Sequence, residues 1–317
     1  MSISAQKTPD EGATYFLNRL ISDLVGTVSA CSSCVTDIAV DSSFDSLGSV
    51  YPLIGIKGVS RELIGSAVSI SGGYFLAAKH SVSGYLRPFT SYGAKTLPGF
   101  AVAIDDAGSI GQSKIVDLQF VTEVADDVDL VLLRISSVKD SQLLKSARLP
   151  AFESSILTSQ LLSRINSFGT GALFVGFGAM SRTGLSQKLQ KNDITTFICN
   201  QDLAAQTISQ LYGAHCDNPV VEKNNKVTGK EYEHYFLTIG SSQRYPHWND
   251  SGGGLFVFHE GKVYLVGLHF KAIKSGNKNP LTYPLFVNLL SVGSRIASLI
   301  KEDRISFLKS NSDHHQN

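Results

Sequence analysis

Apolar residues follow two different periodicities along the chain. In residues 13–30 they recur at helical spacing and predict an amphipathic helix, with its stripe at Phe16, Leu20, Leu24 and Val28. Residues 35–48 are rich in Asp and Ser and have the composition of a linker. From residue 49 onward, short segments rich in β-branched and aromatic residues are separated by Gly, Ser and Asp, which is typical of an all-β barrel or sandwich.

The β-rich part of the chain divides into two halves. A polar stretch over 137–163 separates them, and a helical periodicity follows the second half over 285–300. We therefore predict an N-terminal helical extension with its linker, a first β domain, a second β domain and a final helix with a polar tail. Their predicted bounds are 1–48, 49–150, 151–284 and 285–317.

Composition excludes several classes of protein. Hydrophobic residues make up 43% of the 317-residue chain and charged residues 17%, so most of the chain is expected to fold. A net charge of +1 gives no case for a nucleic-acid partner. No apolar run approaches the roughly 18 residues of a membrane span, and the first residues lack the apolar core of a cleaved signal peptide. We expect a cytoplasmic protein, or an effector delivered into another cell.

The four cysteines indicate neither a metal site nor a redox site. Cys31 and Cys34 form a single C-x-x-C, and no second pair lies at metal-ligand spacing. Cys199, His215 and Cys216 with one of the first pair could supply four ligands, but the spacing does not require it. Reduced thiols without a metal or other cofactor are the preferred interpretation.

Three segments carry residues of the kinds that act together in nucleophilic catalysis. His80 follows the apolar segment Tyr74–Ala78, Asp129 precedes an apolar strand, and Ser251 lies in the glycine-rich sequence Asp-Ser-Gly-Gly-Gly. A serine hydroxyl becomes an effective nucleophile when an imidazole takes its proton, and a carboxylate holds that imidazole in the required tautomer. Glycine allows backbone N–H groups to converge on a developing oxyanion.

In these three segments the sequence resembles the trypsin- and chymotrypsin-like serine proteases. Leu-Ala-Ala-Lys-His-Ser is similar to the family's Thr-Ala-Ala-His, Asp129 begins a segment like Asp-Ile-Ala-Leu-Leu-Lys, and Asp-Ser-Gly-Gly matches around Ser251. The order His, Asp, Ser also matches, with separations of 49 and 122 residues. The resemblance implies two six-stranded antiparallel β-barrels followed by a C-terminal helix. Asp127 is a rival for the acid, but Asp129 fits the motif without a shift.

The resemblance also assigns an oxyanion hole and a specificity pocket. The backbone N–H groups of Asn249 and Ser251 would bind the oxyanion, although the family normally has Gly at the position of Asn249. Gly-Leu-His-Phe is similar to the segment of glutamyl endopeptidases and picornavirus-type proteases whose histidine binds Glu or Gln at P1. This makes His269 and its neighbours Phe270 and Lys271 candidate substrate-binding residues. Tyr245 stands near the expected pocket floor, where cleavage after Lys or Arg would require an acid.

The predicted function is that of a serine endopeptidase acting on protein or peptide substrates, with a preference for Glu or Gln at P1. Two alternatives remain open. An inactive protein that keeps the protease fold and binds a partner is favoured by Asn249 alone. An esterase using the same triad is the other, although the motif order disfavours the α/β-hydrolase type.

Overall fold

The computed structural model describes residues 44–91, 98–104, 112–178, 190–200, 202, 204, 234–240, 250–274 and 282–313. Apart from Phe44, these residues belong to one compact unit, Asp45–Asn317. The predicted helix over 13–30 and its linker up to residue 43 lie outside the described residues. None of the described helices is long and apolar enough to cross a bilayer.

The first half of the unit is a closed antiparallel barrel with the strand order β1-β2-β3-β6-β5-β4. Its strands are β1 (Val50–Lys57), β2 (Ser60–Ser69), β3 (Tyr74–Ala77), β4 (Gly99–Ala103), β5 (Ile115–Glu123) and β6 (Val131–Ile135). Its helical segments are η1 (Phe44–Ser49), η2 (Ser71–Gly73), α2 (Lys79–Ser91) and η3 (Val138–Leu143).

The second half is a closed antiparallel barrel with the order β10-β11-β12-β9-β8-β7. Its strands are β7 (Thr170–Gly178), β8 (Gln190–Ile198), β9 (Tyr235–Gly240), β10 (Gly254–His259), β11 (Lys262–Lys274) and β12 (Thr282–Asn288). Two helices precede it, α3 (Pro150–Glu153) and α4 (Ser155–Phe168), and α6 (Leu289–Asp313) follows it. The prediction of two six-stranded antiparallel barrels with a C-terminal helix is confirmed, and the arrangement fits a chymotrypsin-like fold.

The C-terminal helix begins later than the sequence pattern predicts. Leu285, Phe286 and Val287 pair with β9 and β11 as part of β12, so the helix starts at Leu289 and not at residue 285. The side-chain oxygen of Asn288 accepts a hydrogen bond of 3.0 Å from the Leu290 N–H, which satisfies one of the free donors of the first turn.

The three largest buried clusters among the described residues hold the fold together. One fills the first barrel around Phe75 and Leu133, and another fills the second barrel around Phe174 and Phe286. The third joins residues of both barrels to α6, which includes Ile296. This third cluster packs the barrels against each other and so fixes the surfaces that meet between them.

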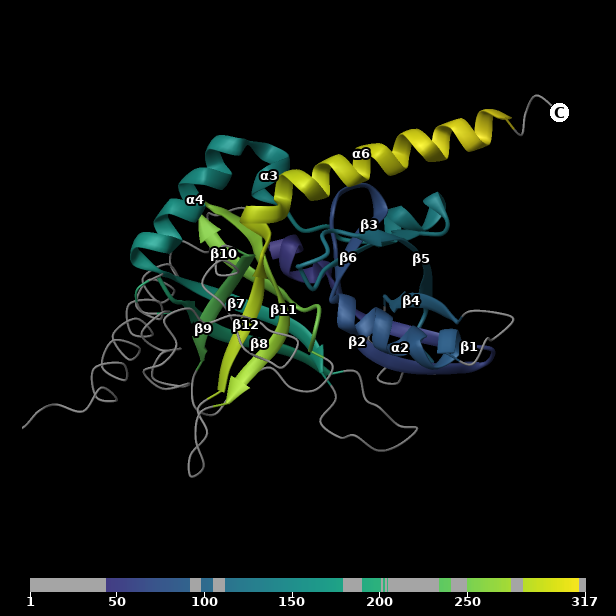
Figure 1. Cartoon of the computed structure of the whole chain (residues 1–317), viewed down its shortest axis with the longest axis horizontal. Helices are drawn as coiled ribbons and strands as arrows, with labels where there is room; N and C mark the ends of the chain where they lie inside the picture. Colours follow the sequence, from purple (N-terminus) through teal and green to yellow (C-terminus); the bar gives the residue numbers. More distant parts are fainter. Residues whose placement is uncertain are drawn as a thin grey trace, which may run out of the picture. The chain divides into compact units, whose positions relative to one another are not determined.

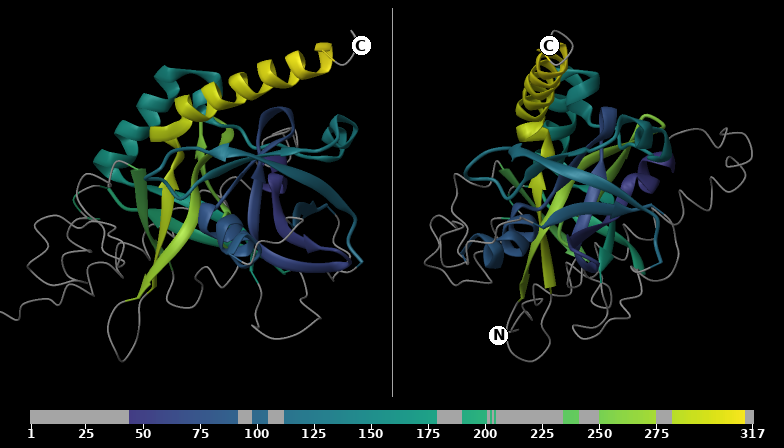
Figure 2. Two further views of the ribbon diagram at one scale, coloured as in Figure 1. Left: turned by 45° about the vertical axis from the view of Figure 1, so that its right-hand side comes forward. Right: turned by 90° about the vertical axis from the view of Figure 1, so that its right-hand side faces the viewer.

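The helix α6 also contacts the first barrel through polar groups. Figures 1 and 2 show α6, in yellow, leaving β12 and running past β3 and β6. The Asp303 carboxylate accepts hydrogen bonds of 2.7 Å from the Tyr74 hydroxyl and 2.7 Å from the Arg134 guanidinium. The helix therefore links the second barrel, from which it continues, to the first.

Candidate active site

The first barrel brings His80 and Asp129 together through strand register. Ala77 on β3 pairs with Val131 on β6, so the residues just beyond the end of β3 lie beside the residues just before β6. The Lys79 N–H donates to the Asp129 carbonyl at 3.4 Å, and the Leu130 side chain beside Asp129 is fully buried. His80 thus lies in the first turn of α2, facing the loop that carries Asp129.

Ser251 lies in a tight turn immediately before β10. The Gly253 N–H donates to the Asp250 carbonyl at 2.9 Å, and Gly252 has a φ of +88°, in the left-handed region that glycine adopts without strain. The turn is joined to β11 by two backbone hydrogen bonds, from Gly252 N–H to His269 C=O at 2.7 Å and from His269 N–H to Gly253 C=O at 2.8 Å. These hydrogen bonds to β11 therefore fix the position of the Ser251 backbone in the second barrel.

The three side chains form a continuous hydrogen-bonded chain across the two barrels. His80 Nδ1 lies 2.5 Å from Asp129 Oδ2, and His80 Nε2 lies 3.0 Å from Ser251 Oγ. The His80 backbone N–H donates to the other carboxylate oxygen, Oδ1, at 2.8 Å. With Nδ1–H donated to Asp129, Nε2 has its lone pair facing the serine hydroxyl, which is the arrangement that a general base requires.

The rival acid, Asp127, contacts a different histidine. Its Oδ2 lies 3.7 Å from His234 Nε2, and its side chain is 59% exposed. Among the described residues, the carboxylate that contacts His80 is that of Asp129. Asp129 therefore lies beside His80, and Asp127 lies beside His234.

His269 is buried inside the second barrel beside the serine turn. Its ring lies between those of Phe174 and Phe286, at centroid distances of 5.6 Å and 5.3 Å, and the residue is 4% exposed. Neither ring nitrogen makes a hydrogen bond of good geometry with a described residue, although backbone groups of Asp250 and Lys271 lie near enough to the ring to raise its pKa. Burial, followed by the nearby His80, lowers the pKa of the His269 imidazole to about 3, so the ring is neutral at pH 7.

The two residues after His269 lie at an irregularity in β11. The register with β12 shifts between His269 and Lys271, and the Phe270 ring packs on that of Tyr235 with a centroid distance of 4.6 Å. Burial lowers the pKa of the Lys271 ammonium group. The other two residues that the sequence analysis selected, Tyr245 and Asn249, lie outside the described residues.

One residue that contacts the site was missed by the sequence analysis. Ser66 on β2 donates its backbone N–H to the Ser251 carbonyl at 2.7 Å. It belongs to no motif and stands in an ordinary strand sequence, so nothing along the chain distinguishes it from other serines in strands. Its contact arises from the packing of the two barrels.

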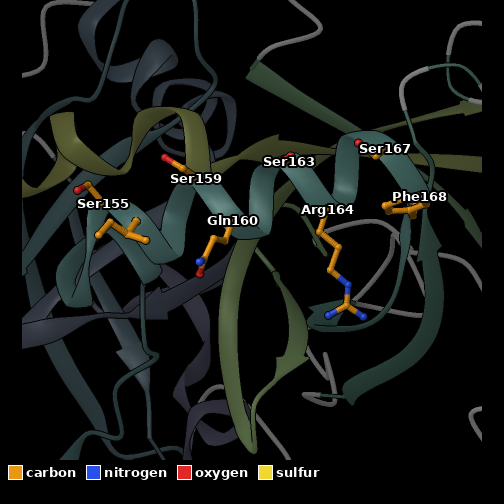
Figure 3. Close-up of a pocket in the computed structure, with 8 residues that line it drawn as sticks. Ser155, Ser159, Gln160, Ser163, Arg164, Ser167 and Phe168 are labelled. Carbon is orange, nitrogen blue, oxygen red and sulfur yellow. The ribbon is translucent and has the colours of Figure 1, made fainter.

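A pocket elsewhere on the second half of the chain lacks this chemistry. In Figure 3 Ser159, Ser163 and Ser167 point to one side of α4, and Gln160 and Arg164 point to the other. None of the serines that line this pocket contacts an imidazole in the part of the chain that the structure describes. The described residues also contain no group of three or more His, Cys, Asp or Glu placed to hold a metal ion. The arrangement of His80, Asp129 and Ser251 is therefore the candidate active site.

Comparisons with known proteins give no assignment. Neither the protein-family models nor the curated proteins compared with this chain match it.

The neutral, buried state of His269 makes stability depend on pH. Its pKa is about 3 in the folded protein and 6.5 in a model peptide, so between these values the unfolded chain binds a proton that the folded protein does not. The free energy of unfolding should therefore fall as the pH falls below about 6.5. Wild type should lose about 2 kcal/mol more than His269→Gln between about pH 7.5 and about pH 5. Urea unfolding at both pH values measures this, and equal losses would contradict the buried neutral state.

Proposed function

We propose that this protein is a serine endopeptidase whose nucleophile is Ser251. Three observations support the proposal: the hydrogen-bonded chain of Asp129, His80 and Ser251, the double-barrel fold, and the position of the serine in a turn rich in glycine. The first carries the most weight, because an imidazole in contact with both a carboxylate and a serine hydroxyl has the geometry of an activated nucleophile.

The reaction follows from these contacts. The Ser251 Oγ attacks the scissile carbonyl carbon while its proton passes to His80 Nε2, and the carbonyl oxygen becomes an oxyanion. His80 then gives that proton to the leaving amine as the C–N bond breaks, which leaves an acyl group on Ser251. A water molecule then attacks the acyl carbon while its proton passes to His80 Nε2. The bond to Ser251 Oγ breaks, the proton returns to Oγ, and the carboxylic acid product leaves. Asp129 orients His80 and stabilises its protonated form throughout.

The oxyanion would be bound by backbone N–H groups of the serine turn. We assign this role to the N–H groups of Ser251 and Asn249, and the left-handed backbone of Gly252 supports a turn tight enough for such groups to converge. Two donors aimed at the developing charge contribute to catalysis because they need no reorganisation during the reaction.

The P1 preference is assigned to His269. Its buried ring nitrogens make no hydrogen bond of good geometry with a described residue, and a neutral imidazole donates one N–H to an oxygen of the P1 side chain. The amide of Gln suits this donor better than the carboxylate of Glu, because a buried negative charge facing a neutral ring remains uncompensated. Phe270, Lys271 and Tyr245 are the other proposed substrate-binding residues.

Peptides that differ only at P1 test the assignment to His269. We expect kcat/KM to be at least about tenfold higher for Gln than for Lys or Leu, with Glu in between, because unpaired buried polar groups penalise the wrong side chain. His269→Ala should abolish the difference between Gln and Leu. A preference that survives this substitution would assign P1 recognition to other residues.

The test of the proposed function is labelling with a fluorophosphonate, followed by intact-mass measurement and peptide mapping. Wild type should carry a single adduct on Ser251, and Ser251→Ala and His80→Ala should carry none. Ser83→Ala, which changes an exposed serine of α2, is the control and should be labelled like wild type. A folded wild-type protein without an adduct would overturn the proposal and favour a partner-binding protein.

A further inference from the structure

Ser66 is a fully buried serine at the junction of the two barrels. It lies near the end of β2 in the first barrel, and its relative exposure is 0%. Its backbone N–H and its side-chain oxygen both form hydrogen bonds with the second barrel. The backbone N–H donates to the Ser251 carbonyl at 2.7 Å, and the side-chain oxygen accepts a hydrogen bond of 2.8 Å from the Phe177 N–H on β7.

One of these hydrogen bonds ends on the serine turn itself, and the other ends on β7. Phe177 follows Gly176, and a Cβ added to Gly176 would lie 2.8 Å from the carboxylate oxygen Oδ1 of Asp250, the residue before Ser251. The end of β7 is therefore packed against the start of the turn, while the Ser66 N–H holds the carbonyl of Ser251 itself. The contact is close, since a Cβ at Gly252 would lie 1.9 Å from the Ser66 carbonyl oxygen.

The connection from Ser66 to the general base is short. The next residue on β2, Ala67, pairs with Ala77 on β3, and Ala77 stands three positions before His80. The position of Ser251 relative to His80 thus depends on a route through β2 and β3 in the first barrel. The direct link between the two side chains is the 3.0 Å hydrogen bond between Ser251 Oγ and His80 Nε2.

We propose that the Ser66 side chain is a positioning residue for Ser251, an inference that rests on the proposed function. Its oxygen satisfies a buried backbone donor of β7, and without that acceptor the Phe177 N–H would remain buried and unpaired. The end of β7 and the serine turn then have to move to reach another acceptor. A shift of this kind lengthens the contact between Ser251 and His80, and catalysis is sensitive to displacements of about 1 Å.

The experiment compares Ser66→Ala with Ser69→Ala. Ser69 lies on the same strand, is also 0% exposed, and its hydroxyl contacts Ser146 within the first barrel. The two variants therefore remove the same group from the same strand, but the Ser69 hydroxyl bonds to Ser146 and not to the serine turn. Saturation kinetics of fluorophosphonate labelling give the rate constant of the chemical step, kinact, and the binding constant, KI.

Ser66→Ala should lower kinact by about 10- to 100-fold and leave KI within about twofold of wild type, whereas Ser69→Ala should change neither. A loss of folded protein would reduce the labelled fraction without changing kinact. Equal kinact values for Ser66→Ala and wild type would overturn the inference.

Amide hydrogen exchange tests the same inference without catalysis. Ser66→Ala should accelerate exchange in the peptides that contain Phe177 and residues 251–254, and Ser69→Ala should not. If wild type carries no adduct, the proposed function fails. Amide hydrogen exchange alone then tests whether the Ser66 side chain positions the serine turn. Accelerated exchange in both peptides supports the positioning contact, and unchanged exchange in either of them overturns it.

Discussion

Asp129→Asn is expected to lower kcat by about 10⁴-fold while leaving the protein folded. The carboxylate accepts from both His80 Nδ1 and the His80 backbone N–H. An amide at this position would turn its NH₂ group toward Nδ1, which then accepts and leaves the proton on Nε2. The ring would then face Ser251 with an N–H in place of a lone pair, so that it could not take the proton of the hydroxyl.

Asp127→Asn is the matched control for this substitution. It changes the same side chain two residues away, in the same loop, where the carboxylate contacts His234 and not His80. Hydrolysis of a peptide substrate and thermal unfolding should be measured for both variants. Asp127→Asn should keep kcat within about twofold of wild type, because partly exposed ion pairs contribute little. A large loss in Asp127→Asn together with an active Asp129→Asn would exchange the roles of the two acids.

The sequence predicted the strand content of the fold well because most strands are short, apolar and separated by turn residues. The prediction was less accurate where an apolar run is compatible with both a helix and a strand. Leu285 to Asn288 is four residues long and continues the helical stripe of the segment that follows it, yet it forms the end of β12. Pairing with β9 and β11 decides its structure, and such pairing cannot be seen in the local sequence.

The residues of the candidate site were likewise predicted only in part. His80, Asp129 and Ser251 were found because each stands at the end of a recognisable apolar segment and the three occur in a known order. Ser66 could not be found, because its contacts with Ser251 and Phe177 depend on how the barrels pack. The burial of His269 between two phenylalanine rings likewise follows from the closed second barrel. Motifs thus predicted which three side chains form the hydrogen-bonded chain, and packing determined the residues around them.

The same packing makes Gly252 the glycine of the serine turn that is least tolerant of a side chain. Gly252→Ala should lower kcat by at least about 100-fold, because its Cβ would lie 1.9 Å from the Ser66 carbonyl oxygen and neither backbone can give way without moving Ser251. Alanine in the left-handed region adds about 1–2 kcal/mol of backbone strain. Peptide hydrolysis and urea unfolding measure the two effects.

Gly261→Ala distinguishes the effect of backbone strain from that of the steric clash with Ser66. Gly261 has a φ of +76°, close to the +88° of Gly252, but an added Cβ there would have no neighbour within 4 Å. It should therefore share the backbone cost of about 1–2 kcal/mol and keep the kcat of wild type. If Gly252→Ala lost no more activity than Gly261→Ala, the turn would tolerate displacement from Ser66. The contact between the barrels would then matter for stability and not for the alignment of Ser251 with His80.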